Sequence, residues 1–140
     1  MARRTTKNST TFRSNFEAKV AESLDRQGIV WTYESEQWEY EYDIRKAKCA
    51  ECGSTEVRQI RTYTPDFILP DLGIVLEVKG KFTSKDRTKH LAIQETYPDT
   101  DLRFVFQRDN WLTSKKKKTY TEWCDDNGFE SYVGEFINED

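Results

Sequence analysis

Two carboxylates and a lysine in the middle of the chain have a spacing that suits chemistry on a phosphate. Asp66 follows Pro65, and further along the chain Glu77 and Lys79 flank Val78. On a β-strand, residues two positions apart project from the same face, so Glu77 and Lys79 would lie together while Val78 points into the core. A tight hairpin would bring Asp66 beside Glu77 from the neighbouring strand. Two carboxylates and an ammonium group on adjacent strands suit a hard cation and a phosphate.

Each of these residues also has a structural explanation. Asp66 is of a type that is common in turns, and Glu77 and Lys79 can simply form an ion pair. Glu17, a further carboxylate, can close a capping box with Ser14 at the start of a helix. These explanations suffice for each residue alone, but together the residues fit a single site.

The elements that position these side chains follow from periodicity and from capping signals. Capping boxes begin helices at Ser14 and Thr119, and glycines end these helices at Gly28 and Gly128. In chain order we predict a helix over 14–27, strands over 29–33, 37–44, 60–63, 67–69 and 74–79, a helix over 85–96, a strand over 102–106 and a helix over 119–127. This order predicts an α/β fold with a mixed central β-sheet flanked by helices.

Length and composition favour one domain rich in aromatic residues. The chain has 140 residues, of which 36% are hydrophobic and 14% are aromatic, so the aromatic side chains must fill much of a single core. We predict a flexible basic arm over residues 1–12 and a single domain over 13–140. No run is apolar enough to span a membrane and no secretory signal is visible, so we expect a cytoplasmic protein with no membrane partner.

The cysteines pose a separate question. Their number, three, argues against a disulfide framework. Cys49 and Cys52 lie in a polar loop predicted over 45–59, and their spacing is that of half a zinc knuckle. The other half of a tetrahedral site could come from the same pair in a second chain, or from Cys124 and His90. Two free thiols fit the sequence equally well, so a structural zinc ion is one of two open readings.

The charge is uneven along the chain. The net charge is −3, yet residues 121–140 contain several acidic residues and no lysine or arginine, so the remainder is net basic. Basic residues cluster near the N-terminus, over 79–89 and over 115–118. Phosphate binding depends on local fields, and three clusters in one small domain favour a polyanion as partner.

Four segments together resemble one enzyme family. Pro-Asp followed by Glu-x-Lys across a hairpin resembles the PD-(D/E)xK nuclease superfamily. A closer resemblance, over about residues 12–107, is to the phage endonuclease I family of Holliday junction resolvases. It is carried, in this order and spacing, by Phe-Arg-Ser-Asn-Phe-Glu-Ala-Lys-Val (12–20), Tyr-Thr-Pro-Asp-Phe-Ile-Leu-Pro (63–70), Gly-Ile-Val-Leu-Glu-Val-Lys-Gly (73–80) and Asp-Arg-Thr-Lys-His-Leu (86–91).

The resemblance implies a structure-selective, metal-dependent DNA endonuclease that resolves Holliday junctions and other branched DNA by phosphodiester hydrolysis. Its products would carry 5′ phosphate and 3′ hydroxyl ends, and a phage-encoded enzyme would act in the cytoplasm of the host cell. The implied fold is restriction-endonuclease-like, in an intertwined homodimer that exchanges the first helix and strand. The implied catalytic residues are Glu17, Asp66, Glu77 and Lys79.

The resemblance also implies roles around a pair of Mg²⁺ ions, which Mn²⁺ can replace. Asp66 would bridge the two ions, Glu77 and the Val78 carbonyl would ligate the ion beside the attacking water, and Glu17 would ligate the second ion. Lys79 would orient or help deprotonate the water. Because no base-reading motif is visible, branched DNA would be recognised by its shape. The candidate phosphate contacts are Arg3, Arg4, Lys7, Arg13, Lys81, Lys85, Arg87, Lys89, His90, Lys115, Lys116, Lys117 and Lys118.

Two other functions stay open. A PD-(D/E)xK nuclease with restriction-like or mismatch-nicking specificity would use the same four residues. A non-enzymatic zinc-knuckle adaptor for nucleic acid, built around Cys49 and Cys52, would leave the carboxylates and Lys79 without an explanation.

Overall fold

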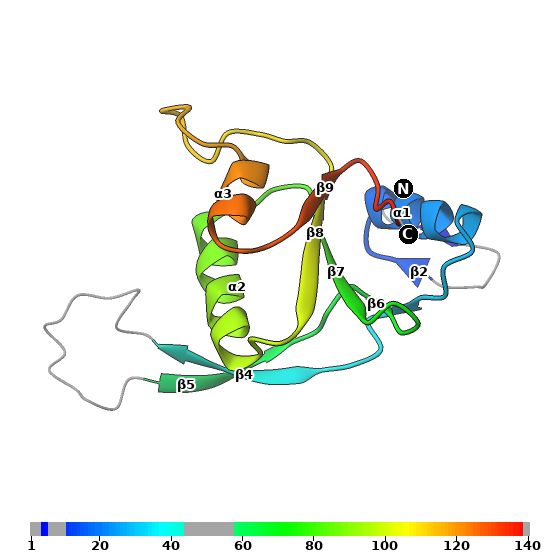
Figure 1. Cartoon of the computed structure of the whole chain (residues 1–140), viewed down its shortest axis with the longest axis horizontal. Helices are drawn as coiled ribbons and strands as arrows, with labels where there is room; N and C mark the ends of the chain where they lie inside the picture. The colour runs from blue at the N-terminus through cyan, green and yellow to red at the C-terminus, as the bar shows by residue number, and fades with distance from the viewer. Residues whose placement is uncertain (1–3, 6–10, 44–57, 139–140) are drawn as a thin grey trace, which may run out of the picture.

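A five-stranded mixed sheet forms the centre of the molecule (Figure 1). The computed structural model describes residues 4–5, 11–43 and 58–138. Across the sheet the order is β3-β6-β7-β8-β9; β6 pairs antiparallel with β3 and β7, and β8 pairs parallel with β7 and β9. The strands are β3 (Thr32–Tyr33), β6 (Phe67–Leu69), β7 (Ile74–Lys79), β8 (Asp101–Phe106) and β9 (Ser131–Val133). A helix connects each parallel pair, as a crossover connection requires.

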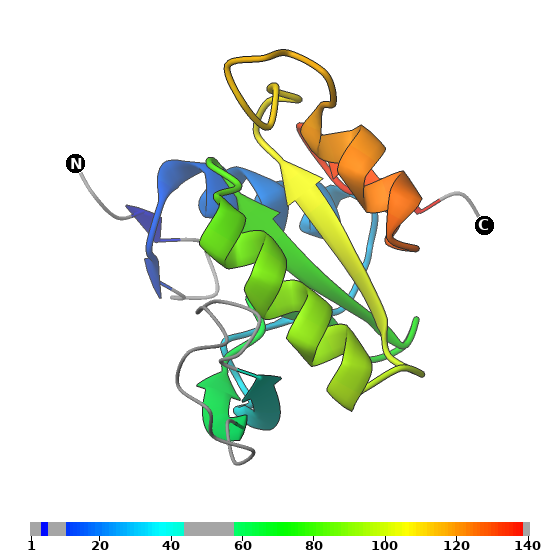
Figure 2. The ribbon, with the colours of Figure 1, turned by 90° about the vertical axis from the view of Figure 1, so that its left-hand side faces the viewer.

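Helices cover both faces of the sheet. Figure 2 shows α2 lying across β7 and β8, with α1 behind the sheet. Each N-cap side chain, Ser14, Thr83 or Thr119, accepts a hydrogen bond from the backbone N–H of the third helical residue. The helices are α1 (Asn15–Arg26), α2 (Ser84–Thr96) and α3 (Tyr120–Asp126). The predicted α/β class and the mixed sheet flanked by helices are therefore confirmed.

The alternation of side chains along β7 separates two hydrophobic cores. Leu76 and Val78 pack on the α1 side of the sheet, whereas Val75 packs on the α2 side. Glu77 and Lys79 follow Val75 at intervals of two residues, so they belong to the α2 face of the strand. As predicted, Glu77 and Lys79 lie on the face of β7 opposite to Leu76 and Val78.

Strands β4 (Trp38–Asp43) and β5 (Arg58–Tyr63) form a separate antiparallel ribbon. The Tyr97 hydroxyl, at the C-cap of α2, donates to the Glu39 carbonyl at 2.5 Å and ties the ribbon to that helix. The sequence predicts strands here, but not that they leave the central sheet. Alternation identifies a strand without identifying its neighbour.

Part of the predicted flexible arm is folded. Strands β1 (Arg4–Thr5) and β2 (Thr11–Phe12) pair antiparallel, and the Phe12 side chain is completely buried in the core on the α1 side. Residues 1–3 and 6–10 of the arm lie outside the described residues. Phe12 is thus a core residue two positions before the Ser14 helix cap. The division into an arm over 1–12 and a domain over 13–140 stays a prediction.

Other boundaries also differ from the sequence prediction. The strand predicted over 29–33 is regular only in β3, and residues 58–59, predicted as loop, belong to β5. Strand β9, which pairs with β8, was not predicted from the sequence. In the described part of the chain, no helix is long and apolar enough to cross a membrane.

Candidate active site

The pairing of β6 with β7 brings the predicted carboxylates together. Phe67 lies opposite Leu76, so the residues next to them, Asp66 and Glu77, stand side by side where the hairpin opens. The Asp66 Oδ2 atom accepts a hydrogen bond from the Val78 N–H at 2.8 Å. Both carboxylates are buried, so their charges need partners other than bulk water.

Glu77 has its partners on both carboxylate oxygens. The Tyr63 hydroxyl donates to Oε1 at 2.5 Å. The Lys79 Nζ atom lies 3.2 Å from Oε2, and the His90 Nε2 atom lies 3.8 Å from the same oxygen. The predicted ion pair between Glu77 and Lys79 therefore exists, but it is one contact of a larger buried group.

Glu17 reaches the same region from the first turn of α1. Its N–H donates to the Ser14 hydroxyl at 3.1 Å, as a helix cap requires. Its Oε1 atom accepts hydrogen bonds from the Ser14 hydroxyl at 3.3 Å and from the Tyr33 hydroxyl at 3.2 Å. The side chain is buried, and its negative charge helps to raise the pKa of Asp66. Capping and a place at the site are thus compatible roles for Glu17.

Lys79 is held between two carboxylates. Besides Glu77, its Nζ atom contacts Asp86 Oδ1 at 3.4 Å. Asp86 is the third residue of α2, where its carboxylate accepts from the N–H and the hydroxyl of Thr83 in a capping box. Burial favours loss of the proton from Lys79, but the charges of Glu77 and Asp86 outweigh it, so its pKa is raised. Lys79 is therefore a fixed ammonium group.

The two central carboxylates differ in their electrostatics. Burial and the neighbouring charge of Glu77 raise the pKa of Asp66 to about 8, although the Val78 N–H opposes this. Burial also opposes ionisation of Glu77, but His90, Lys79 and the Tyr63 hydroxyl outweigh it and lower the pKa of that carboxyl. Burial and the charge of Glu77 raise the pKa of Tyr63, which keeps its hydroxyl a donor. A second negative charge at Asp66 would thus be poorly compensated by the chain alone.

This donor set fits a magnesium ion. Among the described residues, no three His, Cys, Asp or Glu side chains are grouped so that they could enclose a metal ion. Magnesium does not need such a cage, because it keeps several waters and uses one or two carboxylates together with phosphate oxygens of the substrate. Asp66 and Glu77 are such a carboxylate pair, and the raised pKa of Asp66 marks a local lack of positive charge.

Comparison with known proteins identifies the family. The model of the phage endonuclease I family matches residues 1–139. The chain belongs to the phage endonuclease I family. It is 39% identical over 118 residues to Endonuclease I of Escherichia phage T7, across 84% of this chain and 69% of that protein. The match to Endodeoxyribonuclease 1 of Enterobacteria phage T3 is also 39% over 118 residues and covers 68% of that protein.

Some of the residues predicted to contact phosphates have exposed side chains. Lys81, Lys85, Lys115, Lys116 and Lys117 are exposed. Others have partners within the chain: Arg13 pairs with Glu34, Lys118 pairs with Asp126, Arg87 donates to the Phe82 carbonyl at 2.7 Å, and the Lys89 ammonium lies 5.2 Å from the centre of the Tyr63 ring. Lys118 and Arg13 are exposed as well, but each is paired with a carboxylate. The best candidates for contacts with DNA phosphates are therefore Lys81, Lys85, Lys115, Lys116 and Lys117.

His90 does not lie where a phosphate contact was expected. Its side chain is completely buried, beside Glu77 and between aromatic rings. The position on α2 was predictable, but a lone histidine between Lys89 and Leu91 gives no sign of which way it faces. This burial favours a structural role for His90, and its contact with DNA stays a prediction.

Several predicted residues lie outside the described part of the chain. Arg3, Lys7, Cys49 and Cys52 are among them, and for Arg4 the structure describes the backbone alone. The other two suggested zinc ligands, Cys124 and His90, are both completely buried. The zinc site stays a prediction.

Sequence reasoning did not find three residues of the site. Tyr63 supplies the hydroxyl bound to Glu77, Tyr33 supplies one bound to Glu17, and Asp86 contacts Lys79. Tyr63 stands three residues before Asp66, where strand alternation assigns it only to a core. Asp86 was identified only within the segment that resembles the family.

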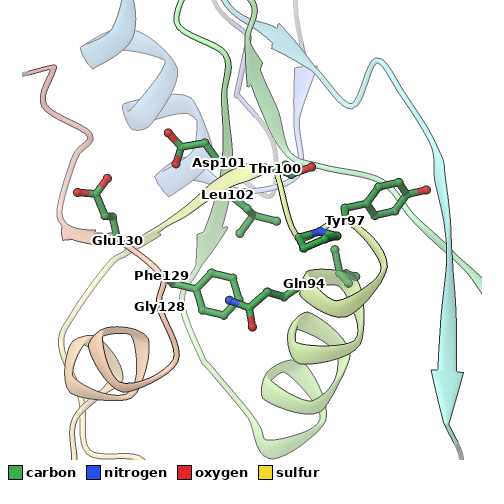
Figure 3. Close-up of a pocket in the computed structure, with 10 residues that line it drawn as sticks. Gln94, Tyr97, Thr100, Asp101, Leu102, Gly128, Phe129 and Glu130 are labelled. Atoms are coloured by element: carbon green, nitrogen blue, oxygen red, sulfur yellow. The ribbon is translucent and has the colours of Figure 1, made fainter.

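A pocket of about 120 Å³ lies at the opposite end of the sheet (Figure 3). Asp101 and Leu102, at the start of β8, and Gly128 and Phe129, before β9, contribute to its lining. Because Asp101 pairs with Ile74, the pocket is at the end of β7 away from Lys79. It is separate from the carboxylate site.

Proposed function

We infer that this chain is a metal-dependent DNA endonuclease that resolves Holliday junctions and other branched DNA by phosphodiester hydrolysis. The observation that carries the proposal is the buried pair of Asp66 and Glu77 beside the ammonium group of Lys79. Membership of the phage endonuclease I family and the names of its T7 and T3 relatives support a DNA endonuclease. The preference for branched DNA is our further proposal and goes beyond what the names of these relatives state.

The metal ions proposed are two Mg²⁺ ions per site, with Mn²⁺ as a substitute. Asp66, Glu77, Glu17 and the Val78 carbonyl would hold them. When bound, such ions polarise the phosphate, activate a water and stabilise the leaving oxygen. The protein contributes oxygen donors fixed by folding: the Val78 N–H orients Asp66, and the Tyr33 and Ser14 hydroxyls orient Glu17.

We propose that Lys79 orients the attacking water or helps to remove its proton, and that it offsets negative charge in the transition state. In the metal-free protein burial lowers its pKa, but the charges of Glu77 and Asp86 raise it overall, which favours the ammonium form. Glu77 and Asp86 hold it at that position.

A homodimer with exchanged segments is part of the proposal. Glu17 belongs to the segment 11–43, whereas Asp66, Glu77 and Lys79 belong to 58–138. One chain can unite all four, and a dimer that exchanges the first segment would make the same contacts between two chains. Two sites at a fixed separation would then recognise a junction by its shape.

The test of this function is a comparison of DNA substrates. Purified protein is incubated with a four-way junction, a nicked duplex and a linear duplex of the same sequence, with Mg²⁺ and with EDTA. We expect symmetric cuts near the branch point of the junction with Mg²⁺ only. Sequence-dependent cutting of the linear duplex would point instead to a restriction-like nuclease. Binding of nucleic acid without any cleavage would point to an adaptor.

A further inference from the structure

His90 is a buried polar side chain whose environment is unusual. It is completely inaccessible to solvent, and neither ring nitrogen has a hydrogen-bond partner among the described residues. Buried polar groups are nearly always hydrogen-bonded, so such an exception needs an explanation. The Oε2 atom of the charged Glu77 side chain lies 3.8 Å from Nε2, beyond hydrogen-bond distance.

Aromatic rings fix the orientation of the imidazole. The ring centre lies 5.4 Å from that of Tyr63 at an interplanar angle of 88°, and 4.9 Å from that of Phe104 at 78°. These edge-to-face contacts come from β5 and β8, while α2 carries the histidine itself. Because the rings of Tyr63 and Phe104 and the backbone of α2 restrict the imidazole, its Nε2 atom stays directed at the Glu77 carboxylate.

Tyr63 acts on the other oxygen of the same carboxylate. Its hydroxyl donates to Oε1 at 2.5 Å, and the tyrosine is almost completely buried. Tyr63 and His90 therefore approach Glu77 from the interior, and they also contact each other. Lys79, whose side chain is 18% exposed, approaches Oε2 from the open side.

We propose that Tyr63 and His90 are positioning residues that hold the Glu77 carboxylate in the one orientation in which it can ligate a divalent cation. Tyr63 occupies Oε1 with a hydrogen bond. His90 stands close enough to Oε2 for a small shift of the carboxylate to complete a second one. This inference rests on the proposed function, in which Glu77 is a metal ligand. Neither residue touches DNA or the cation.

The first test replaces the tyrosine. Tyr63→Phe keeps the ring contacts with His90 and Trp38 and removes only the hydroxyl. The affinity of the DNA-free protein for Mn²⁺ is measured by calorimetry. We expect it to fall about 10- to 100-fold, the range typical for loss of a residue that orients a metal ligand. With Mg²⁺, kcat on a four-way junction should fall while the KM for the junction stays unchanged.

The second test uses a pair of histidine variants. His90→Phe retains an aromatic ring between Tyr63 and Phe104 but removes both nitrogens, and it should weaken Mn²⁺ binding about 10-fold. His90→Gln restores an N–H donor and should recover part of that loss. Recovery by glutamine separates positioning from packing, because glutamine packs less well than phenylalanine against the rings.

Tyr97→Phe is the matched control. It deletes another tyrosine hydroxyl with a 2.5 Å hydrogen bond, here to the Glu39 carbonyl, and it should lower the melting temperature without changing Mn²⁺ affinity. If Tyr63→Phe and His90→Phe behave like this control, the inference is wrong and the two residues are merely structural. If the wild-type protein itself binds no Mn²⁺, the proposed function fails first. That result is distinct, because it appears before any variant is compared.

Discussion

The negative charge of Asp66 is poorly compensated in the metal-free protein. Glu77 has the Tyr63 hydroxyl on one oxygen and Lys79 near the other, and its pKa is lowered despite burial. Asp66 accepts a backbone N–H and faces the charge of Glu77, and its pKa is raised to about 8. Two neighbouring carboxylates with pKa values displaced in opposite directions are typical of functional sites.

Asp66→Asn should therefore stabilise the metal-free protein at alkaline pH. The pKa of Asp66 in the folded state, about 8, lies above its value in the unfolded chain, about 4. The unfolded state thus loses its proton first, and folding becomes less favourable as the pH rises between these values. Asparagine keeps an acceptor for the Val78 N–H without the charge. In EDTA, we expect the variant to gain up to about 5 kcal/mol over wild type at pH 9, because each unit of pKa difference is worth about 1.4 kcal/mol, and to gain little near pH 4.

Urea unfolding across this pH range, in EDTA, measures the effect. Asp99→Asn, which changes an exposed carboxylate, should leave the pH profile of the wild type unaltered. If the free energy of unfolding changes with pH in the same way for wild type and Asp66→Asn, ionisation of Asp66 does not destabilise the folded protein.

At the scale of elements, the carboxyl ends of β7 and β8 connect the site to a basic loop. The Gln107 N–H donates to the Lys79 carbonyl at 3.0 Å, and residues 107–119 then project from the end of β8 (Figure 2). The base of the loop is closed by the Leu112 N–H, which donates to the Lys118 carbonyl at 2.8 Å. The exposed lysines at the tip therefore belong to a loop whose base is fixed by hydrogen bonds and which starts next to Lys79.

Replacing Lys115, Lys116 and Lys117 together by alanine should weaken junction binding and flatten its salt dependence. Each lost phosphate contact lowers the slope of log K against log salt by about 0.9. Fluorescence anisotropy in EDTA at several salt concentrations measures this slope. Arg26→Ala, which removes a cation paired with Glu135 at the far end of α1, should not alter it. An unchanged slope in the triple variant would assign the three lysines to the solvated surface.

The elements were predictable to different degrees for physical reasons. Capping residues are local signals, so α1 and α3 could be placed from Ser14 and Thr119, and the alternation in β7 put Glu77 and Lys79 on one face. Partners distant in sequence leave no local signal. For this reason the separate β4–β5 ribbon, strand β9 and the burial of His90 against Glu77 were not predicted.

At the scale of the whole molecule, the C-terminal segment holds α1 in place. The Gln27 side chain donates to the Phe136 carbonyl at 2.7 Å and accepts from the Asn138 N–H at 3.0 Å. The Ser23 hydroxyl donates to Glu135 at 2.6 Å, and Phe136 is buried in the core beside α1. Glu135 and its neighbours therefore position the helix that carries Glu17, and in an exchanged dimer these contacts would join two chains.

Mixed dimers of Glu17→Ala and Lys79→Ala chains test the exchange. In an exchanged dimer, one site collects both substitutions and the other site is intact, so nicking of a junction should return. Without exchange, each site contains one substitution. The isolated heterodimer is therefore assayed beside both homodimers. A heterodimer as inactive as its parents would show that each chain builds its own site.

We propose that Asp66 and Glu77 act in hydrolysis and not in DNA binding. The most direct measurement is single-turnover cleavage of a four-way junction in Mg²⁺ by Asp66→Asn and Glu77→Gln, with junction affinity measured separately in EDTA. We expect cleavage to fall at least about a thousandfold, because each 1.4 kcal/mol of lost transition-state stabilisation is a factor of ten. Affinity should remain close to that of the wild type. Cleavage at the wild-type rate, or a loss of cleavage matched by an equal loss of binding, would contradict the account.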